Sequence, residues 1–221
     1  MSFSNSVIAA ARQSLYTAVL SDVLDSLGHT EQAMGPGLRH LDEALVLCGR
    51  ARTAMYMEVD HVEKGENPYE LEIALVDDLK PDDVAVMGCG ASSRIAPWGE
   101  LLSTAALARG AVGCVTDGLV RDIKRIRTVR FPVFHGGIAP LDSRGRGKVM
   151  AIDVPIRCAG VRVAPGDLVF GDADGVIAVP AALAERAVSL ALEKVSGENL
   201  VREELARGDS LAVVFARHGI L

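Results

Sequence analysis

An arginine and an aspartate stand side by side at positions 121 and 122, directly after the run Asp117-Gly118-Leu119-Val120. A guanidinium group grips a carboxylate through two parallel hydrogen bonds, so Arg121 could hold an acidic substrate. The carboxylate of Asp122 could bind Mg²⁺ or Mn²⁺, hard cations that favour oxygen ligands and keep several waters. Taken alone, such a pair is more often a surface salt bridge. Its surroundings therefore decide how it is interpreted.

A glycine-rich segment, Met87 to Glu100 (MGCGASSRIAPWGE), supplies those surroundings. It follows an expected strand and precedes an expected helix, which is where open α/β sheets bind ligands. The free backbone amides of Glu100, Leu101 and Leu102 at the helix start would attract an anion such as a carboxylate. The segment is not a dinucleotide fingerprint, because Ser93 stands where the third glycine is needed. A plain glycine-rich turn is the alternative interpretation.

The remaining residues that could do chemistry give weaker signals. The four cysteines are scattered without a CxxC pair, which favours buried free thiols over a zinc site or disulfides. The five histidines form no HxH or HxxxH pair, so a histidine metal site is not indicated. The run Asp172-Ala173-Asp174-Gly175 resembles the start of a calcium loop, but the twelfth position holds no glutamate. We expect a tight turn there.

Composition and charge bound the class of protein. A chain of 221 residues fits one domain, and 49 % hydrophobic residues are enough for a core. The formal charge of −6 disfavours a face that binds nucleic acid. The first residues lack the basic region and apolar stretch of a secretory signal, and no apolar run is long enough to span a membrane. We therefore expect a cytoplasmic protein without nucleic-acid or membrane partners.

Short apolar strands alternating with helices must position the Arg-Asp pair. Helical spacing of apolar residues predicts an N-terminal helix at about 4–28 and a C-terminal helix at about 181–207. Three helices are expected between them, from Pro68, over 99–109 and over 121–126, the last after a turn at Asp117-Gly118. The expected strands are 45–57, 84–87, 111–116, 131–134, 149–156, 161–163, 167–170 and 175–179. This order predicts a single α/β domain with a β-rich layer after Pro140.

The run WGELLSTAALARGAVGCVTDGLVRD, residues 98–122, resembles the core of the regulator-of-ribonuclease-activity-A-like family. That family includes the class II 4-hydroxy-4-methyl-2-oxoglutarate and 4-carboxy-4-hydroxy-2-oxoadipate aldolases. The motifs FPVF, VRVAPGDLVFGDADGVIAVP and YTAVLSDVLDSLG extend the resemblance over most of the chain. It implies a layered β/β/α sandwich, similar to swivelling domains. It also implies a homotrimer or hexamer with active sites between subunits.

The resemblance further implies roles for individual residues. The family's aldolases carry an acid, then twenty residues, then Arg-Asp, and Glu100 precedes Arg121 by that interval. Asp122 matches the metal ligand, while Arg121 matches the residue that holds the carboxylate and keto oxygen of a pyruvyl substrate. A carboxylate from a neighbouring subunit's C-terminal helix completes the family's site, and Glu198 is the best match for it. The pyruvate-binding backbone matches Gly99, Leu101 and Leu102.

The activity that the resemblance implies is Mg²⁺- or Mn²⁺-dependent cleavage of a 4-hydroxy-2-oxo acid to release pyruvate. Decarboxylation of oxaloacetate would follow from the same site, since it passes through the same enolate. Glu100 would position the water that protonates this enolate, although the aldolases usually have aspartate there, which puts the substrate in question. Two alternatives stay open: a non-catalytic regulator of a ribonuclease or helicase, and an enzyme of the same fold acting on another hydroxy or sugar acid.

Overall fold

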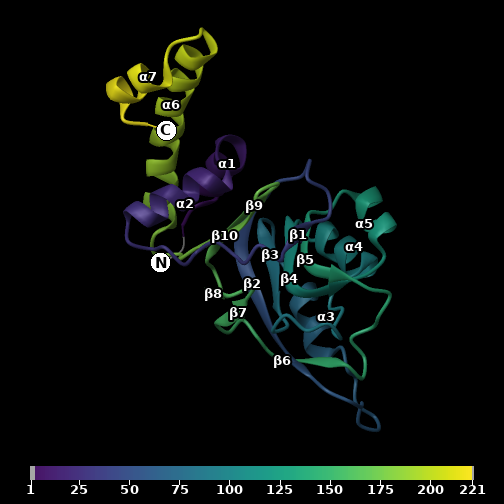
Figure 1. The fold of residues 1–221 in the computed structure, drawn as a ribbon. Helices are drawn as coiled ribbons and strands as arrows, with labels where there is room; N and C mark the ends of the chain where they lie inside the picture. The colour runs from purple at the N-terminus through teal and green to yellow at the C-terminus, as the bar shows by residue number, and fades with distance from the viewer. Residues whose placement is uncertain (1–2, 221) are drawn as a thin grey trace.

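A computed structural model describes residues 3–220 of the chain, which form an α/β fold around one mixed sheet (Figure 1). The strand order in this sheet is β1-β5-β4-β3-β2-β9-β10, with β6 also paired to β2. The helices are α1 (Asn5–Ser14), α2 (Thr17–Ser26), α3 (Glu70–Asp77), α4 (Glu100–Ala108), α5 (Ile123–Val129), α6 (Ala184–Ala206) and α7 (Leu211–His218). The strands are β1 (Arg39–His40), β2 (Leu47–Glu58), β3 (Asp83–Gly88), β4 (Gly113–Val120), β5 (Val133–Ile138), β6 (Gly147–Ile152), β7 (Ile156–Cys158), β8 (Val161–Val163), β9 (Leu168–Asp172) and β10 (Gly175–Val179).

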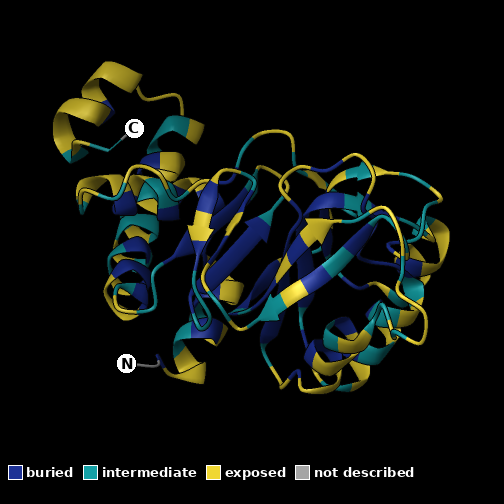
Figure 2. Cartoon of the chain, turned by 90° about the horizontal axis from the view of Figure 1, so that it is seen from below, coloured by how far each residue is buried: buried dark blue, intermediate teal, exposed yellow. Residues whose placement is uncertain are grey.

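The centre of the sheet consists of the parallel strands β2, β3, β4 and β5. All six residues of β3 are buried, as expected for a strand covered on both faces (Figure 2). Ala85 and Met87 pack in one cluster with α3, α4 and α5, whereas Val84 and Val86 pack on the opposite face with β7 and β8. These layers confirm the predicted β/β/α sandwich. A third apolar cluster joins α1, α2 and α6 to β9 and β10.

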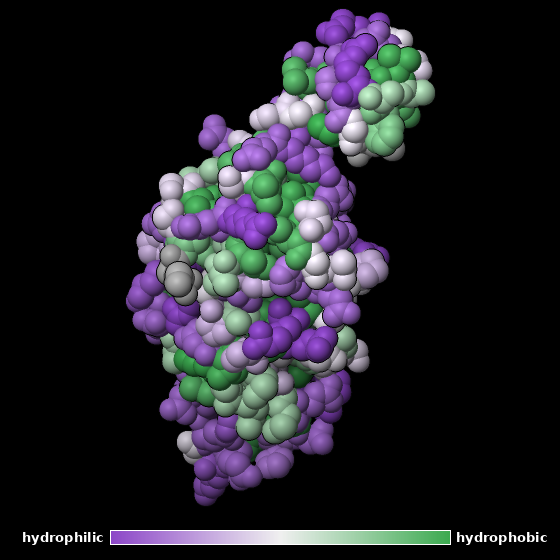
Figure 3. All heavy atoms as spheres, turned by 90° about the vertical axis from the view of Figure 1, so that its left-hand side faces the viewer, coloured by the Kyte–Doolittle hydropathy of each residue, from purple (hydrophilic) through white to green (hydrophobic). Residues whose placement is uncertain are grey.

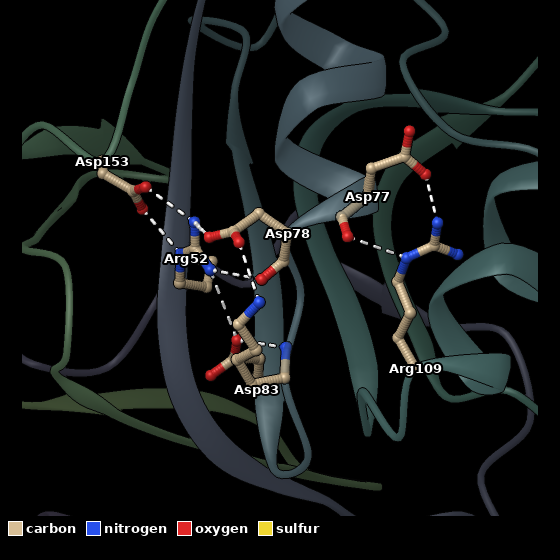
Figure 4. A network of polar contacts seen from close by, with 7 residues as sticks. Arg52, Asp77, Asp78, Asp83, Arg109 and Asp153 are labelled. Atoms are coloured by element: carbon tan, nitrogen blue, oxygen red, sulfur yellow. Dashed lines mark hydrogen bonds and ion pairs between the residues drawn. The ribbon is translucent and has the colours of Figure 1, made fainter.

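An arginine network joins the middle of β2 to the amino end of β3 (Figure 4). The guanidinium of Arg52 on β2 donates to both carboxylate oxygens of Asp153, at 2.8 and 2.7 Å. It also donates to the carbonyl oxygen of Asp78 at 3.0 Å and lies 3.5 Å from the carboxylate of Asp83. One side chain thereby links β2 to the end of α3, the start of β3 and the segment after β6. Bidentate charged pairs of this kind are geometrically specific.

The predicted N-terminal helix at 4–28 is wrong in one respect, because it is two helices. Leu15 and Tyr16 have extended backbone, with φ of −104° and −142°. The break lets Leu15 bury its side chain and starts α2 at Thr17, whose amide and hydroxyl both donate to Asp172. A carboxylate at a helix start satisfies donors that the helix itself leaves free. A contact distant in sequence therefore overrides the continuous apolar pattern.

Other boundaries also differ from the predicted ones. The predicted strand 149–156 is divided into β6 and β7, and β5 continues past the predicted end at 134 to Ile138. The C-terminal helix ends close to the predicted residue, but it is followed by α7, and the two project away from the sheet (Figure 1). Apolar side chains lie exposed on this arm (Figure 3). The large ones are Leu200, Leu211, Val213 and Phe215. Within residues 3–220, no helix is long and apolar enough to cross a membrane.

The close packing of β2 against the β3 layer gives a test of the fold. A Cβ added at Gly49 would lie 2.2 Å from the carbonyl oxygen of Asp82 and 2.8 Å from a methyl group of Val112. We expect Gly49→Ala to lower the free energy of unfolding by roughly 3 kcal/mol, because backbone cannot move aside cheaply. Gly37→Ala is the matched control, since nothing lies within 4 Å of its added Cβ. Urea unfolding of both variants measures the difference, and equal stabilities would contradict this packing.

Candidate functional site

The Arg-Asp pair lies at the junction between β4 and α5. The predicted turn at Asp117-Gly118 is wrong, because β4 continues to Val120 and α5 begins only at Ile123. Asp122 has left-handed backbone, with φ of 62° and ψ of 30°. Aspartate tolerates this conformation better than most residues, and such outliers gather at functional sites. The pair therefore sits at the carboxyl end of a buried parallel strand, as open α/β sheets favour for ligand binding.

The start of α4 lies directly against this junction. Trp98 forms a parallel bridge with Val120, and the amide of Arg121 donates to the carbonyl oxygen of Trp98 at 3.1 Å. The amide of Glu100 then points to the carboxylate of Asp122, at 3.4 Å. A Cβ on Gly99 would lie 2.9 Å from that carboxylate, so glycine permits the approach. The structure thus brings together the two segments that the sequence placed side by side.

A pocket of about 290 Å³ opens between α3, the start of α4 and the Arg-Asp junction. Arg121 reaches across it: its guanidinium lies 3.3 Å from the carboxylate of Asp142 and 3.7 Å from that of Asp122. Leu101 is 76 % exposed and lies at the helix start, where backbone amides have no partner within the helix. The lining residues are Tyr69, Glu72, Ile73, Ala96, Pro97, Trp98, Gly99, Leu101, Leu102, Arg121, Asp122, Asp142 and Ser143.

Two acids of the predicted site are placed differently. The carboxylate of Glu100 accepts a hydrogen bond of 2.9 Å from the hydroxyl of Thr104, one turn along α4. Glu100 is not among the described residues that line the pocket. Glu198 on α6 accepts a hydrogen bond from the hydroxyl of Tyr16 and lines a separate hollow beside α2. Within one chain Glu198 therefore does not reach the pocket. Its role across subunits stays a prediction, as does the catalytic role of Glu100.

The family profile described as RraA-like, Aldolase/RraA, matches residues 17–178. The chain belongs to the RraA-like family. The resemblance carried by the sequence motifs is thereby confirmed. The matched region contains the strands of the central sheet, the start of α4 and the Arg-Asp junction, so the pocket is built from family elements.

Proteins similar to this chain include ones named as aldolases and one described as a ribonuclease inhibitor relative. A Halalkalibacterium halodurans protein is 31 % identical over 89 % of this chain and 87 % of its own length, and is provisionally named a 4-hydroxy-4-methyl-2-oxoglutarate aldolase. The Thermus thermophilus aldolase of that name is 35 % identical over 41 % of this chain, a match that spans 55 % of that enzyme. A Streptomyces coelicolor structure, described as an unusual member of the RNase ES inhibitor RraA family, has a TM-score of 0.80 and 27 % identity. It covers 91 % of this chain and 98 % of that one.

The donor groups of this RraA-like protein suit a cation that keeps much of its water. Within residues 3–220, no three His, Cys, Asp or Glu side chains gather as a metal cage. The Asp122 side chain is 43 % exposed, so it could bind a cation while waters and a substrate fill the other positions. Mg²⁺ is commonly bound in this way, through one or two carboxylates, whereas structural zinc needs four protein ligands. Asp122 is therefore a fitting ligand for Mg²⁺ or Mn²⁺.

One lining residue, Glu72 on α3, was not predicted from the sequence. Its side chain is 7 % exposed and accepts a hydrogen bond of 2.5 Å from the hydroxyl of Tyr56. Burial raises the pKa of the Glu72 carboxyl to about 7. A signal was available in the sequence, because Glu72 lies three and four residues before the core residues Leu75 and Val76. An acid on the apolar face of a helix indicates a functional position.

The raised pKa of Glu72 predicts a pH-dependent stability that Glu72→Gln should remove. A folded-state pKa near 7 against the ordinary value of 4.5 means that the folded protein holds an extra proton between these values. Relative to Glu72→Gln, the wild type should lose about 3 kcal/mol of stability as the pH rises from 4 to 8. Urea unfolding across this range measures the difference. A difference that is independent of pH would contradict the raised pKa.

Proposed function

We propose that this protein is a lyase that cleaves the C3–C4 bond of a 4-hydroxy-2-oxo acid and releases pyruvate. The proposal rests on one observation: residues that suit an anion and a residue that suits a cation line the same pocket. Arg121, Asp122 and two residues of the first turn of α4, Leu101 and Leu102, all line it. A helix start and an arginine together favour the binding of an anion, and the adjacent carboxylate of Asp122 favours the binding of a cation. A 2-oxo acid bound to a divalent metal ion combines both requirements.

The residues of the chain divide the work as follows. The amides of Leu101 and Leu102 would hold the substrate carboxylate, because helix starts offer donors without internal partners. Arg121 would bind the 2-keto oxygen and stabilise the negative charge that develops there as the C3–C4 bond breaks. A Mg²⁺ or Mn²⁺ ion on Asp122 would supply Lewis-acid polarisation of the same oxygens. Oxaloacetate would lose CO₂ at this site, since that reaction also leaves the pyruvate enolate.

Assembly into a homotrimer or hexamer belongs to the proposal. The exposed apolar side chains of the arm formed by α6 and α7 favour contact with a further copy of the chain. Glu198 lies on the same arm, and a neighbouring copy could bring it to the pocket. We place no nucleic acid among the partners, because the net charge is −6.

A non-catalytic regulatory role is the second candidate. It is favoured by the likeness to a Streptomyces coelicolor protein of the RNase ES inhibitor family and by the carboxylate of Glu100, which is hydrogen-bonded to Thr104. A regulator needs no convergence of arginine, aspartate and helix amides inside a pocket, so this arrangement favours the lyase. Enzymatic turnover of a 2-oxo acid distinguishes the two.

The test is pyruvate release from 4-hydroxy-4-methyl-2-oxoglutarate and from oxaloacetate, with Mg²⁺ or Mn²⁺ and then with EDTA. We expect metal-dependent turnover of both substrates that EDTA abolishes. Arg121→Lys should lower kcat/KM by about 10²- to 10³-fold, because lysine cannot form the forked contact. Arg125→Lys, on the exposed face of α5, is the matched control and should retain full activity. Absence of metal-dependent turnover with either substrate would overturn the lyase assignment.

A further inference from the structure

Glu72 lines the same pocket as Arg121 and Asp122, but the proposed division of work gives it no role. Cleavage of a 4-hydroxy-2-oxo acid requires a group that removes the proton of the C4 hydroxyl, and the enolate left behind must regain a proton at C3. Neither a guanidinium nor a metal-bound aspartate suits this task, because both must keep their charge. Glu72 is a carboxyl group that lines the same pocket from α3, across from the start of α4.

The hydrogen bonding of Glu72 leaves one of its oxygens available. The hydroxyl of Tyr56 donates to Oε2, and within residues 3–220 no group donates to Oε1. Tyr56 is 8 % exposed, and burial raises its pKa well above the ordinary value, so it remains a neutral donor. A purely structural buried pair would satisfy both carboxyl oxygens. Here Tyr56 holds one oxygen, the other has no donor among the described residues, and Glu72 lines the pocket.

The groups around Glu72 shift its pKa in opposite directions. Burial is the largest influence and raises the pKa of Glu72, and the carboxylate of Asp142 also raises it, to a net value of about 7. The hydrogen bond from Tyr56 and the positive charge of Arg121 lower it. Cys89 after β3 also faces this group, but burial raises the thiol pKa and keeps it neutral. On the β6 side, Lys148 is engaged by Glu66, and at the start of α3 the hydroxyl of Tyr69 donates to Asp142.

We propose that Glu72 is the proton-transfer residue of this pocket, an inference that rests on the proposed lyase function. Its carboxylate takes the proton of the C4 hydroxyl as the C3–C4 bond breaks and the electron pair of that bond passes to the pyruvate enolate. The C4–O bond becomes the carbonyl of the second product. Glu72 then returns the same proton to C3 of the enolate, giving pyruvate. The cycle is balanced without an external acid or base.

A group that accepts and then donates a proton works best when its pKa lies near the operating pH. Glu72 fulfils this condition at neutral pH, since both its forms are populated there. The sequence suggested that Glu100 positions a water that protonates the enolate; in this proposal Glu72 supplies that proton instead. Glu100 supplies a backbone amide beside Asp122, and Glu72 moves the proton.

Exchange of the methyl protons of pyruvate for deuterium, followed by NMR in D₂O with Mg²⁺, isolates the proton transfer at C3. We expect wild-type protein to catalyse this exchange and Glu72→Gln to slow it by about a hundredfold or more, with pyruvate affinity unchanged. Glu70→Gln, on the exposed face of the same helix, is the matched control and should exchange at the wild-type rate. Tyr56→Phe removes a contact that lowers the pKa of Glu72, so it should move the pH profile of exchange to higher pH.

The outcomes separate this inference from the lyase assignment. If wild-type protein exchanges and cleaves while Glu72→Gln does both at the full rate, Glu72 has no such role and the lyase assignment stands. If wild-type protein binds pyruvate but neither exchanges its protons nor cleaves a substrate, both are overturned. Should Glu72→Gln fail to fold, Tyr56→Phe decides: an unshifted pH profile would overturn the role of Glu72, and an upward shift would support it.

Discussion

The site depends on how Trp98 anchors the first turn of α4 against the end of β4. The indole is 1 % exposed and stacks on Phe131, with ring centroids 6.1 Å apart. Its nitrogen donates to the hydroxyl of Ser103 at 2.8 Å, and that hydroxyl donates to the carbonyl oxygen of Gly99 at 3.0 Å. A buried, fully bonded residue therefore fixes the helix start. With the start fixed, the amides of α4 must face the Arg-Asp junction.

The rest of the fold keeps this junction in place while leaving it open. The network of Arg52 ties β2 to the start of β3, the end of α3 and the segment after β6, and the apolar layers bury β3 on both faces. The junction after β4 holds the strained backbone of Asp122, and α3 holds the buried carboxyl of Glu72 beside it. The stable sheet thus supports two energetically unfavourable features at the pocket, the strained backbone of Asp122 and the buried carboxyl of Glu72, as functional sites commonly require.

Much of this arrangement could be predicted from local sequence, and the exceptions have physical reasons. Apolar runs predicted the buried strands, and the segment Met87 to Glu100 with the Arg121-Asp122 pair predicted the junction with its helix start. The break between α1 and α2 could not be predicted, because it depends on Asp172, which is distant in sequence. Glu72 was missed although its spacing to Leu75 and Val76 places it on the buried face of α3; its hydrogen bond with Tyr56, a residue on another element, could not be predicted. Spacing indicates which residues are neighbours along the chain, but not which carboxyl groups become buried.

In the proposed function, the Arg-Asp junction and the start of α4 together bind a 2-oxo acid beside a divalent cation. Anomalous X-ray diffraction from crystals grown with Mn²⁺ and pyruvate tests it most directly. We expect a manganese peak within coordination distance of the Asp122 carboxylate, with the pyruvate carboxylate on the amides of Leu101 and Leu102 and its keto oxygen facing Arg121. Manganese or pyruvate bound elsewhere, with this pocket empty of both, would contradict the account.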